Sequence, residues 1–127
     1  MEPFSSQVTF LNFCDLEAGK AFLQDVLGLE VVYDIGWAVV YGIAGKAFLG
    51  AVDRAGSGRA QDRDAMLISL TTGEIEAWHD RIAARLPGVS PIREVPDAAL
   101  ASFFFTGPEG YRFEIQQFLL PQLQELF

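Results

Sequence analysis

Cysteine, histidine and long apolar runs are scarce in this chain of 127 residues, which has one Cys and one His. The single cysteine, Cys14, excludes an internal disulfide and any zinc site built from several thiolates. No stretch approaches the ~18 consecutive apolar residues of a membrane-spanning helix. The opening Met1-Glu2-Pro3 is not followed by the apolar run of a signal peptide. We therefore expect a cytosolic protein that does not contact membranes.

Basic residues are also few. Nine Lys and Arg stand against 17 Asp and Glu, which gives a net charge of -8 at pH 7. A surface of this sign repels phosphate backbones, so nucleic acid is not an expected partner. The acidic excess favours solubility, and it could also attract cationic small molecules.

The most informative feature that is present is an internal duplication. Residues 7–52 and 65–118 share one plan: a strand, an amphipathic helix and three strands, the last two forming a hairpin around a glycine. Two units are too few for a solenoid, which stacks three or more. The duplication instead predicts a pseudo-symmetric domain with a cleft, and clefts bind small molecules.

The boundaries of the first unit follow from local signals. Asp15 is a plausible N-cap, and Gly28 is the glycine expected just after a helix. The predicted strands are 7–13, 29–34, 37–42 and 46–52.

The second unit follows a polar, glycine-containing segment that we interpret as a linker. Thr72 can cap its helix and Pro87-Gly88 ends it, while His79 is expected on the helix surface. The predicted strands are 65–71, 89–95, 100–106 and 111–118, and residues 119–127 space their leucines like one side of a short helix.

Two segments resemble a known family. They are DLEAGKAFLQDVLGLEVV after the first strand and FFFTGPEGYRFEIQQF at the last hairpin, with Gly107 where Asp is usual. Both are similar to motifs of the vicinal oxygen chelate superfamily, which includes glyoxalase I, bleomycin-resistance proteins and extradiol dioxygenases. The similarity runs from Gln7 to Phe118.

The resemblance implies an α+β fold of two pseudo-symmetric βαβββ modules whose curved mixed sheets enclose a cavity, with helices outside. It also implies a homodimer. We expect one such domain over residues 1–127, divided into module one (5–53), a linker (54–64), module two (65–118) and a C-terminal tail (119–127).

Metal-dependent members of the family place one ligand in the first and one in the last strand of each module. Aligning the two terminal hairpins puts Glu114 at the last ligand position and Leu49 at its counterpart in module one. Counting back from the helix starts puts Val8 and either Ala65 or Met66 at the opening positions. One carboxylate among apolar side chains does not make a divalent metal site, so we expect no metal and no cofactor.

An alignment shifted by one residue would bring Gln7 and Asp64 into these positions instead. Strand alternation opposes this shift, because Gln7 would then share the face of Thr9, Leu11 and Phe13, which we assign to packing against the helix.

Ligand-binding candidates come from strand alternation and from the aromatic positions of bleomycin-resistance proteins. They are Phe10, Asn12, Tyr33, Trp37, Leu49, Phe104, Glu114 and Gln116. A carboxylate on the concave face needs a partner, which for Glu114 could be Arg112, Asn12, Gln116 or solvent. Ordinary strand packing remains an alternative interpretation of Tyr33 and Trp37. The tryptophan that bleomycin-resistance proteins have before the last hairpin is replaced by Ala99.

Three functions stay open. The first is a metal-free homodimer that binds a small organic ligand. The alternative is a metal-dependent lyase or dioxygenase of the same superfamily with a non-standard site around Glu114. The third is a structural or regulatory domain whose cavity is filled by its own side chains, which the eleven Phe residues make credible.

Overall fold

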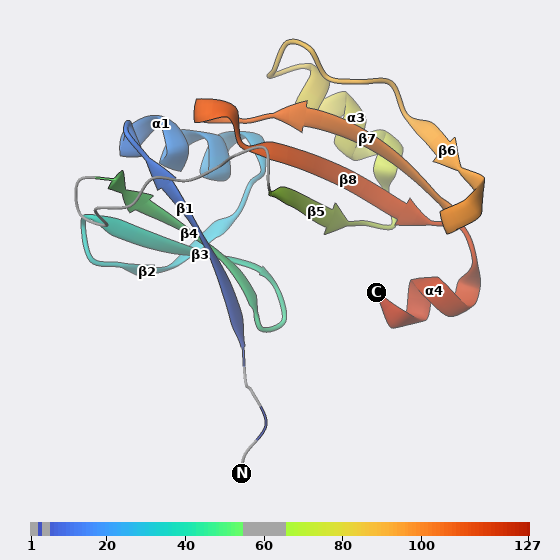
Figure 1. Cartoon of the computed structure of the whole chain (residues 1–127), viewed down its shortest axis with the longest axis horizontal. Coiled ribbons are helices and arrows are strands. Elements are labelled where there is room, and N and C mark those ends of the chain that lie inside the picture. Colours follow the sequence, from blue (N-terminus) through green and yellow to red (C-terminus); the bar gives the residue numbers. More distant parts are fainter. Residues whose placement is uncertain (1–2, 4–5, 55–65) are drawn as a thin grey trace. The chain divides into compact units, whose positions relative to one another are not determined.

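A computed structural model describes residues 3, 6–54 and 66–127 of the chain (Figure 1). The chain divides into two compact units, Met1–Gln61 and Asp62–Phe127. The division falls inside the predicted linker 54–64, which lies outside the described residues except for Arg54. Each unit contains one of the two repeats, and each is described by itself.

The first module is a mixed sheet of four strands with one helical segment. Its elements are β1 (Gln7–Phe13), α1 (Leu16–Ala21), the π-helical turn η1 (Phe22–Val26), β2 (Glu30–Asp34), β3 (Ala38–Ala44) and β4 (Ala47–Asp53). The strand order is β1-β4-β3-β2. β1 runs parallel to β4, and the other neighbours are antiparallel.

The second module repeats this topology. Its elements are β5 (Leu67–Thr71), α3 (Ile75–Ala83), β6 (Arg93–Val95), the short helix η3 (Pro96–Ala98), β7 (Leu100–Thr106), the short helix η4 (Pro108–Gly110), β8 (Arg112–Phe118) and α4 (Pro121–Leu126). The strand order is β5-β8-β7-β6, with β5 parallel to β8. The predicted α+β class and the duplicated βαβββ plan are therefore confirmed.

The helix boundaries follow the predicted signals. Asp15 Oδ1 accepts a hydrogen bond from the Ala18 amide at 3.1 Å, which caps α1 as expected. Gly28 adopts a φ of 67°, the left-handed conformation that ends many helices. The last turn before it is π-helical, because the Leu27 amide bonds to the Phe22 carbonyl.

Helix α3 starts with two side-chain acceptors. Thr72 Oγ1 accepts from the Glu74 amide at 3.0 Å, and Gln117 Oε1 accepts from the Ile75 amide at 3.0 Å. The strand predicted at 89–95 shortens to β6 (Arg93–Val95), since Pro91 has no backbone N–H to donate to a sheet.

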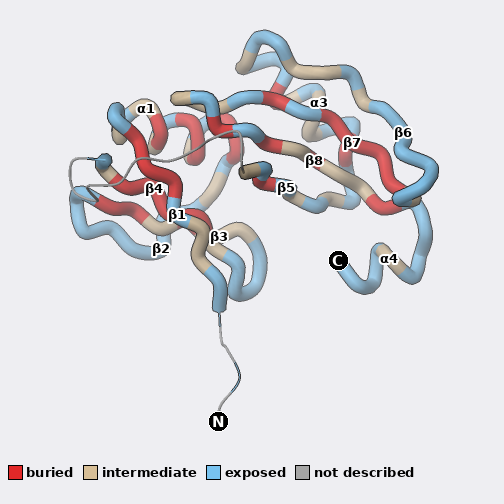
Figure 2. Tube along the Cα trace, in the orientation of Figure 1, coloured by how far each residue is buried: buried red, intermediate tan, exposed pale blue. Residues whose placement is uncertain are grey.

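In the first module, the core lies between the helical segment and one face of the sheet, as the buried parts of β3 and β4 in Figure 2 indicate. Phe13 packs so closely on Gly19 that a Cβ there would lie 2.7 Å from its ring. Tyr41 is fully buried and its hydroxyl accepts from Gln24 Nε2 at 3.1 Å. Burial raises the pKa of Tyr41, so its phenol stays neutral.

Aromatic rings fill the core of the second module. Phe105 stacks on Phe113 with ring centroids 5.4 Å apart. His79 packs edge-on against Phe103 at 4.8 Å, and its Nε2 lies 2.9 Å from the Ser90 carbonyl oxygen. The expectation that His79 lies on the helix surface is therefore wrong, because the ring fills space between α3 and β7.

The C-terminal tail packs on its own module. Gln124 Nε2 donates to the Phe118 carbonyl at 2.8 Å, and the Phe127 ring stacks on Phe118 at 4.6 Å. Each module has one tryptophan. Trp37 precedes β3, and Trp78 on α3 lies under the guanidinium of Arg81 at 5.7 Å.

Candidate functional site

Each sheet has one face covered by its module's helix, and we call the other face the open face. In the second module, Phe103, Phe105 and Phe113 mark the helix-covered side, so the alternate residues of each strand belong to the open face. They are Leu67, Ser69, Thr71, Arg93, Val95, Leu100, Ser102, Phe104, Thr106, Arg112, Glu114, Gln116 and Phe118. Of these, Leu100, Ser102 and Phe118 are buried.

The centre of this open face is a row across three strands. Glu114 on β8 lies between Ser69 on β5 and Phe104 on β7. The Ser69 hydroxyl donates to Glu114 Oε1 at 2.7 Å, which is a short, charge-assisted bond. Phe104 is 39% exposed, so part of a large apolar ring contacts solvent beside a carboxylate.

The next row is polar. Gln116 lies between Thr71 and Ser102, and its Nε2 donates to Thr71 Oγ1 at 3.1 Å. The predicted candidates Phe104, Glu114 and Gln116 are thus brought together on one face, as strand alternation implied.

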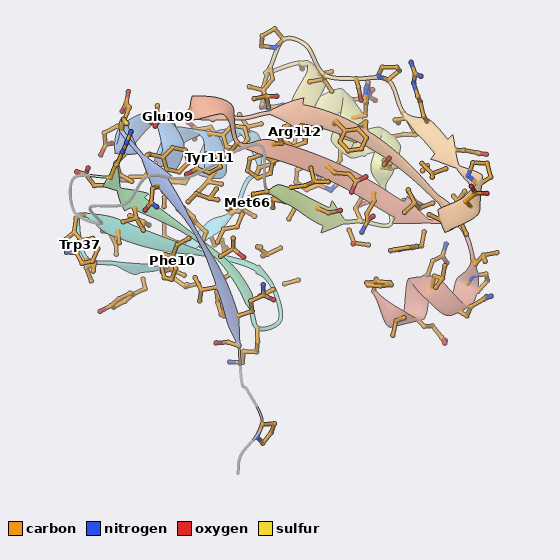
Figure 3. All side chains as sticks on the ribbon, in the orientation of Figure 1. Phe10, Trp37, Met66, Glu109, Tyr111 and Arg112 are labelled. Atoms are coloured by element: carbon orange, nitrogen blue, oxygen red, sulfur yellow. The ribbon has the colours of Figure 1, made fainter. Side chains whose placement is uncertain are left out.

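On the opposite side of the central row lies Arg112, which is labelled in Figure 3. The strand register pairs it with Leu67 on β5 and Thr106 on β7. Arg112 is exposed, and its guanidinium has no hydrogen-bond or ion-pair partner within the described part of the chain. Among the described residues of module two, neither Arg112 nor Gln116 hydrogen-bonds to Glu114, and the Ser69 hydroxyl is its side-chain partner instead.

The open face of the first module is more apolar. Its central row runs from Phe10 on β1 through Gly50 and Val40 to Tyr33 on β2. Phe10 is 48% exposed, and its ring lies directly over Gly50, where a side chain would collide with it (Figure 3). The absence of a side chain at Gly50 therefore leaves room on the sheet for this aromatic ring.

The remaining candidates of this module separate. Asn12 is buried at the end of β1, beside Val52. Tyr33 is 62% exposed and Trp37 is 52% exposed, so strand packing within the module does not account for either ring.

The prediction that Leu49 faces the concave side is wrong. Leu49 lies opposite Tyr41, on the helix-covered side, and is 1% exposed. The cause is the hairpin: in module one the pair Ala44–Ala47 encloses two residues, whereas in module two residues 107–111 separate the paired strands. Counting from the turn glycine therefore slips by one residue, which moves a side chain to the opposite face.

Two polar residues that lie next to Glu114 on the second open face, Ser69 and Arg112, were absent from the predicted binding set. Ser69 and Arg112 have the same alternation as Leu67 and Glu114, so the sequence pattern could place them on this face. The pairing of Ser69 with Glu114 depends on the register of two parallel strands 45 residues apart, which no local signal gives.

These residues do not fit a divalent metal. Within residues 3, 6–54 and 66–127, no three His, Cys, Asp or Glu side chains cluster as metal ligands would. Glu114 is surrounded by a hydroxyl, an aromatic ring and an amide, and the cation Arg112 is two residues away. Met66 precedes β5 and Ala65 lies outside the described residues.

Two hollows border the second module away from Glu114. One, of about 330 Å³, lies beside the tail and is lined by Thr71, Thr72, Gly73, Gln117, Phe118, Gln124 and Phe127. The other, of about 720 Å³, lies beside the start of α3, with Ile75, Ile92 and Ala101 in its lining.

The duplicated topology has a counterpart in known proteins. Residues 6–115 match the sequence pattern of the Glyoxalase/Bleomycin resistance protein/Dioxygenase superfamily. The chain belongs to this superfamily. The resemblance seen in the two sequence motifs is thereby confirmed. No curated protein matches the chain.

Solved structures of the superfamily share the fold. Lactoylglutathione lyase from Agrobacterium tumefaciens is 25% identical with a TM-score of 0.72, and the match covers 92% of this chain and 96% of that one. The fosfomycin resistance protein FosX from Listeria monocytogenes is 18% identical with a TM-score of 0.72, covering 98% of both chains. TnmS3, an antibiotic binding protein from Streptomyces sp. CB03234, is 19% identical with a TM-score of 0.75, covering 92% and 98%.

The described helices are short. None of those in residues 6–54 and 66–127 has the length and apolar character needed to cross a membrane.

Proposed function

We propose that this protein binds a small organic ligand without a metal ion, using the open faces of its sheets. The observation that carries the proposal is the row Ser69–Glu114–Phe104, in which a carboxylate bound by one hydroxyl lies beside a half-exposed ring. Small-molecule sites combine apolar surface with a few placed polar groups, as this row does. The likeness to TnmS3, described as antibiotic binding, supports the same use of the fold.

The side chains divide the work of binding. Glu114 anchors a hydrogen-bond donor of the ligand, and Phe104 offers its ring for stacking. On the first module, Phe10 and Tyr33 present further aromatic surface. Asn12, Trp37 and Gln116 remain candidates at the margins of the two faces, whereas Leu49 contributes to the core.

Glu114→Gln is expected to weaken ligand binding about tenfold or more, because a charge-assisted hydrogen bond contributes roughly 1.5–3 kcal/mol. The melting temperature should change little, since Gln can still accept from Ser69. A stability screen identifies the ligand, since a ligand at 100 times its Kd raises the free energy of unfolding by ~2.7 kcal/mol. That ligand is then titrated against the unmodified protein and the Glu114→Gln variant.

The matched control is Glu125→Gln, which removes the same charge from the exposed face of α4. Unchanged affinity in Glu114→Gln would remove this residue from the site. A lower melting temperature with unchanged affinity would make Glu114 a structural group paired with Ser69.

We expect elemental analysis of the purified protein to find no stoichiometric Fe, Mn, Ni or Zn. The reason is the ligand chemistry around Glu114, which offers a single carboxylate. One metal per chain, lost in Glu114→Ala, would contradict this expectation and favour the alternative function. That alternative is a lyase or dioxygenase with a non-standard metal site, and the lactoylglutathione lyase likeness is the observation in its favour.

We also expect a homodimer in the cytosol. Large apolar side chains are exposed along edge strand β2 and the turn after it, namely Val31, Val32, Tyr33, Ile35 and Trp37. Exposed apolar patches of this kind mark protein interfaces. Light scattering on a size-exclusion column should give twice the 14.0 kDa chain mass. A species of 14.0 kDa throughout the micromolar range would contradict the dimer.

A further inference from the structure

The hydrogen bonds on the open face of module two determine what kind of ligand group fits each position. Glu114 as a carboxylate has no proton to give, so Ser69 donates to it at 2.7 Å. The Ser69 proton is then used, and the pair presents only acceptor lone pairs to solvent. A ligand group at this position must be a hydrogen-bond donor, such as a hydroxyl or an amine.

The neighbouring position has the opposite requirement. Arg112 stands two residues before Glu114 on the same face of β8, about 6.6–6.8 Å away along the strand. Its guanidinium offers donors only, and it has no partner within the described residues. Planar, bidentate recognition of a carboxylate is what an arginine does best.

The adjacent strand supplies an apolar surface along the same line. Phe104 lies beside Glu114 and Thr106 lies beside Arg112, both on β7. Neighbouring strands are about 4.7–4.9 Å apart, so a flat ring over Phe104 can reach both β8 side chains. The donor and acid of the ligand must therefore lie at opposite ends of one planar apolar unit.

We propose that the ligand is an aromatic acid with a hydrogen-bond donor opposite its carboxylate, of the 4-hydroxy- or 4-aminobenzoate kind. This inference rests on the proposed binding function and specifies its ligand class. The carboxylate pairs with Arg112, the donor bonds to Glu114, and the ring stacks on Phe104. Gln116 and Thr71 already bond to each other, and they border the donor end of the ligand.

The test is an NMR titration of the full chain with three probes: 4-hydroxybenzoate, benzoate and phenol. We expect 4-hydroxybenzoate to shift the backbone amides of Ser69, Phe104, Arg112 and Glu114. Benzoate lacks the donor and phenol lacks the acid, so each should bind about tenfold or more weakly.

Variants assign the two ends. Arg112→Gln should weaken the binding of 4-hydroxybenzoate and of benzoate about tenfold and leave the affinity for phenol unchanged. Glu114→Gln should weaken the binding of 4-hydroxybenzoate and of phenol and leave the affinity for benzoate unchanged. Arg85→Gln is the control, because Arg85 lies beyond the end of α3 and donates to the Arg81 carbonyl. Arg112 is exposed and Glu114 is half-buried, so we expect both variants to fold. The dispersion of the amide signals in the same spectra checks that they do.

Three outcomes would overturn the ligand class. They are no binding of 4-hydroxybenzoate, equal affinities for all three probes, and chemical-shift changes confined to other residues. If a stability screen finds a different ligand that shifts the amide signals of Glu114 and Phe104, the proposed binding function stands and only the ligand class is wrong. If no compound in the screen shifts either residue, the binding function is wrong as well.

Discussion

Phe105→Ala is expected to lower the free energy of unfolding by about 3–5 kcal/mol, which is the usual cost of removing a buried Phe ring. Phe105 is buried on the helix-covered side of β7, stacked on Phe113. Phe104 is the next residue along the strand and points to the open face. Phe104→Ala should cost clearly less than Phe105→Ala, because Phe104 is 39% exposed and keeps part of its apolar surface in water in the folded chain.

Urea unfolding followed by circular dichroism gives both free energies under one condition. The two variants make the same chemical change at adjacent positions, so they control for each other. Equal losses would mean that the two faces of this sheet are not distinct. A ligand-binding defect in Phe104→Ala at unchanged stability would support a stacking role for that ring.

Leu49→Glu is expected to abolish folding of the first module, whereas Phe48→Glu should be tolerated. Leu49 is buried opposite Tyr41, and an unpaired buried carboxylate costs several kcal/mol, comparable to the whole stability of ~5–15 kcal/mol. Phe48 is half-buried on the open face beside Val8 and Gly42, where a carboxylate can reach water.

Dispersed amide spectra of the two variants provide the measurement. A well-folded Leu49→Glu with a disordered Phe48→Glu would reverse the assignment of faces in β4. That result would restore the sequence-based expectation that Leu49 belongs to the concave surface.

Local signals predicted most of the fold. Asp15 and Gly28 bound the first helical segment because capping is a property of neighbouring residues. Alternation placed Glu114 and Gln116 on one face for the same reason, since both lie on β8 and a strand itself determines which of its side chains share a face.

Long-range register was beyond such signals. The error at Leu49 arose because the two hairpins enclose different numbers of residues, and equivalence between modules cannot be counted through a turn. The Ser69–Glu114 bond likewise depends on how β5 aligns with β8. The predicted binding role of the eight candidate residues stays a prediction. Leu49 is in the core and Asn12 is buried, whereas the other six are exposed or half-buried.

The two tryptophans give this chain a native fluorescence reporter in each half. Trp37 is in the first unit, in the turn before β3, and Trp78 is on α3 of the second unit, beneath the Arg81 guanidinium. Trp37→Phe leaves emission from the second unit alone, and Trp78→Phe leaves emission from the first. Acrylamide should quench the solvent-exposed indole of Trp37 more strongly than that of half-buried Trp78. Coincident urea transitions in the two single-tryptophan chains would identify one cooperative unit, and separate transitions would show that the halves melt independently.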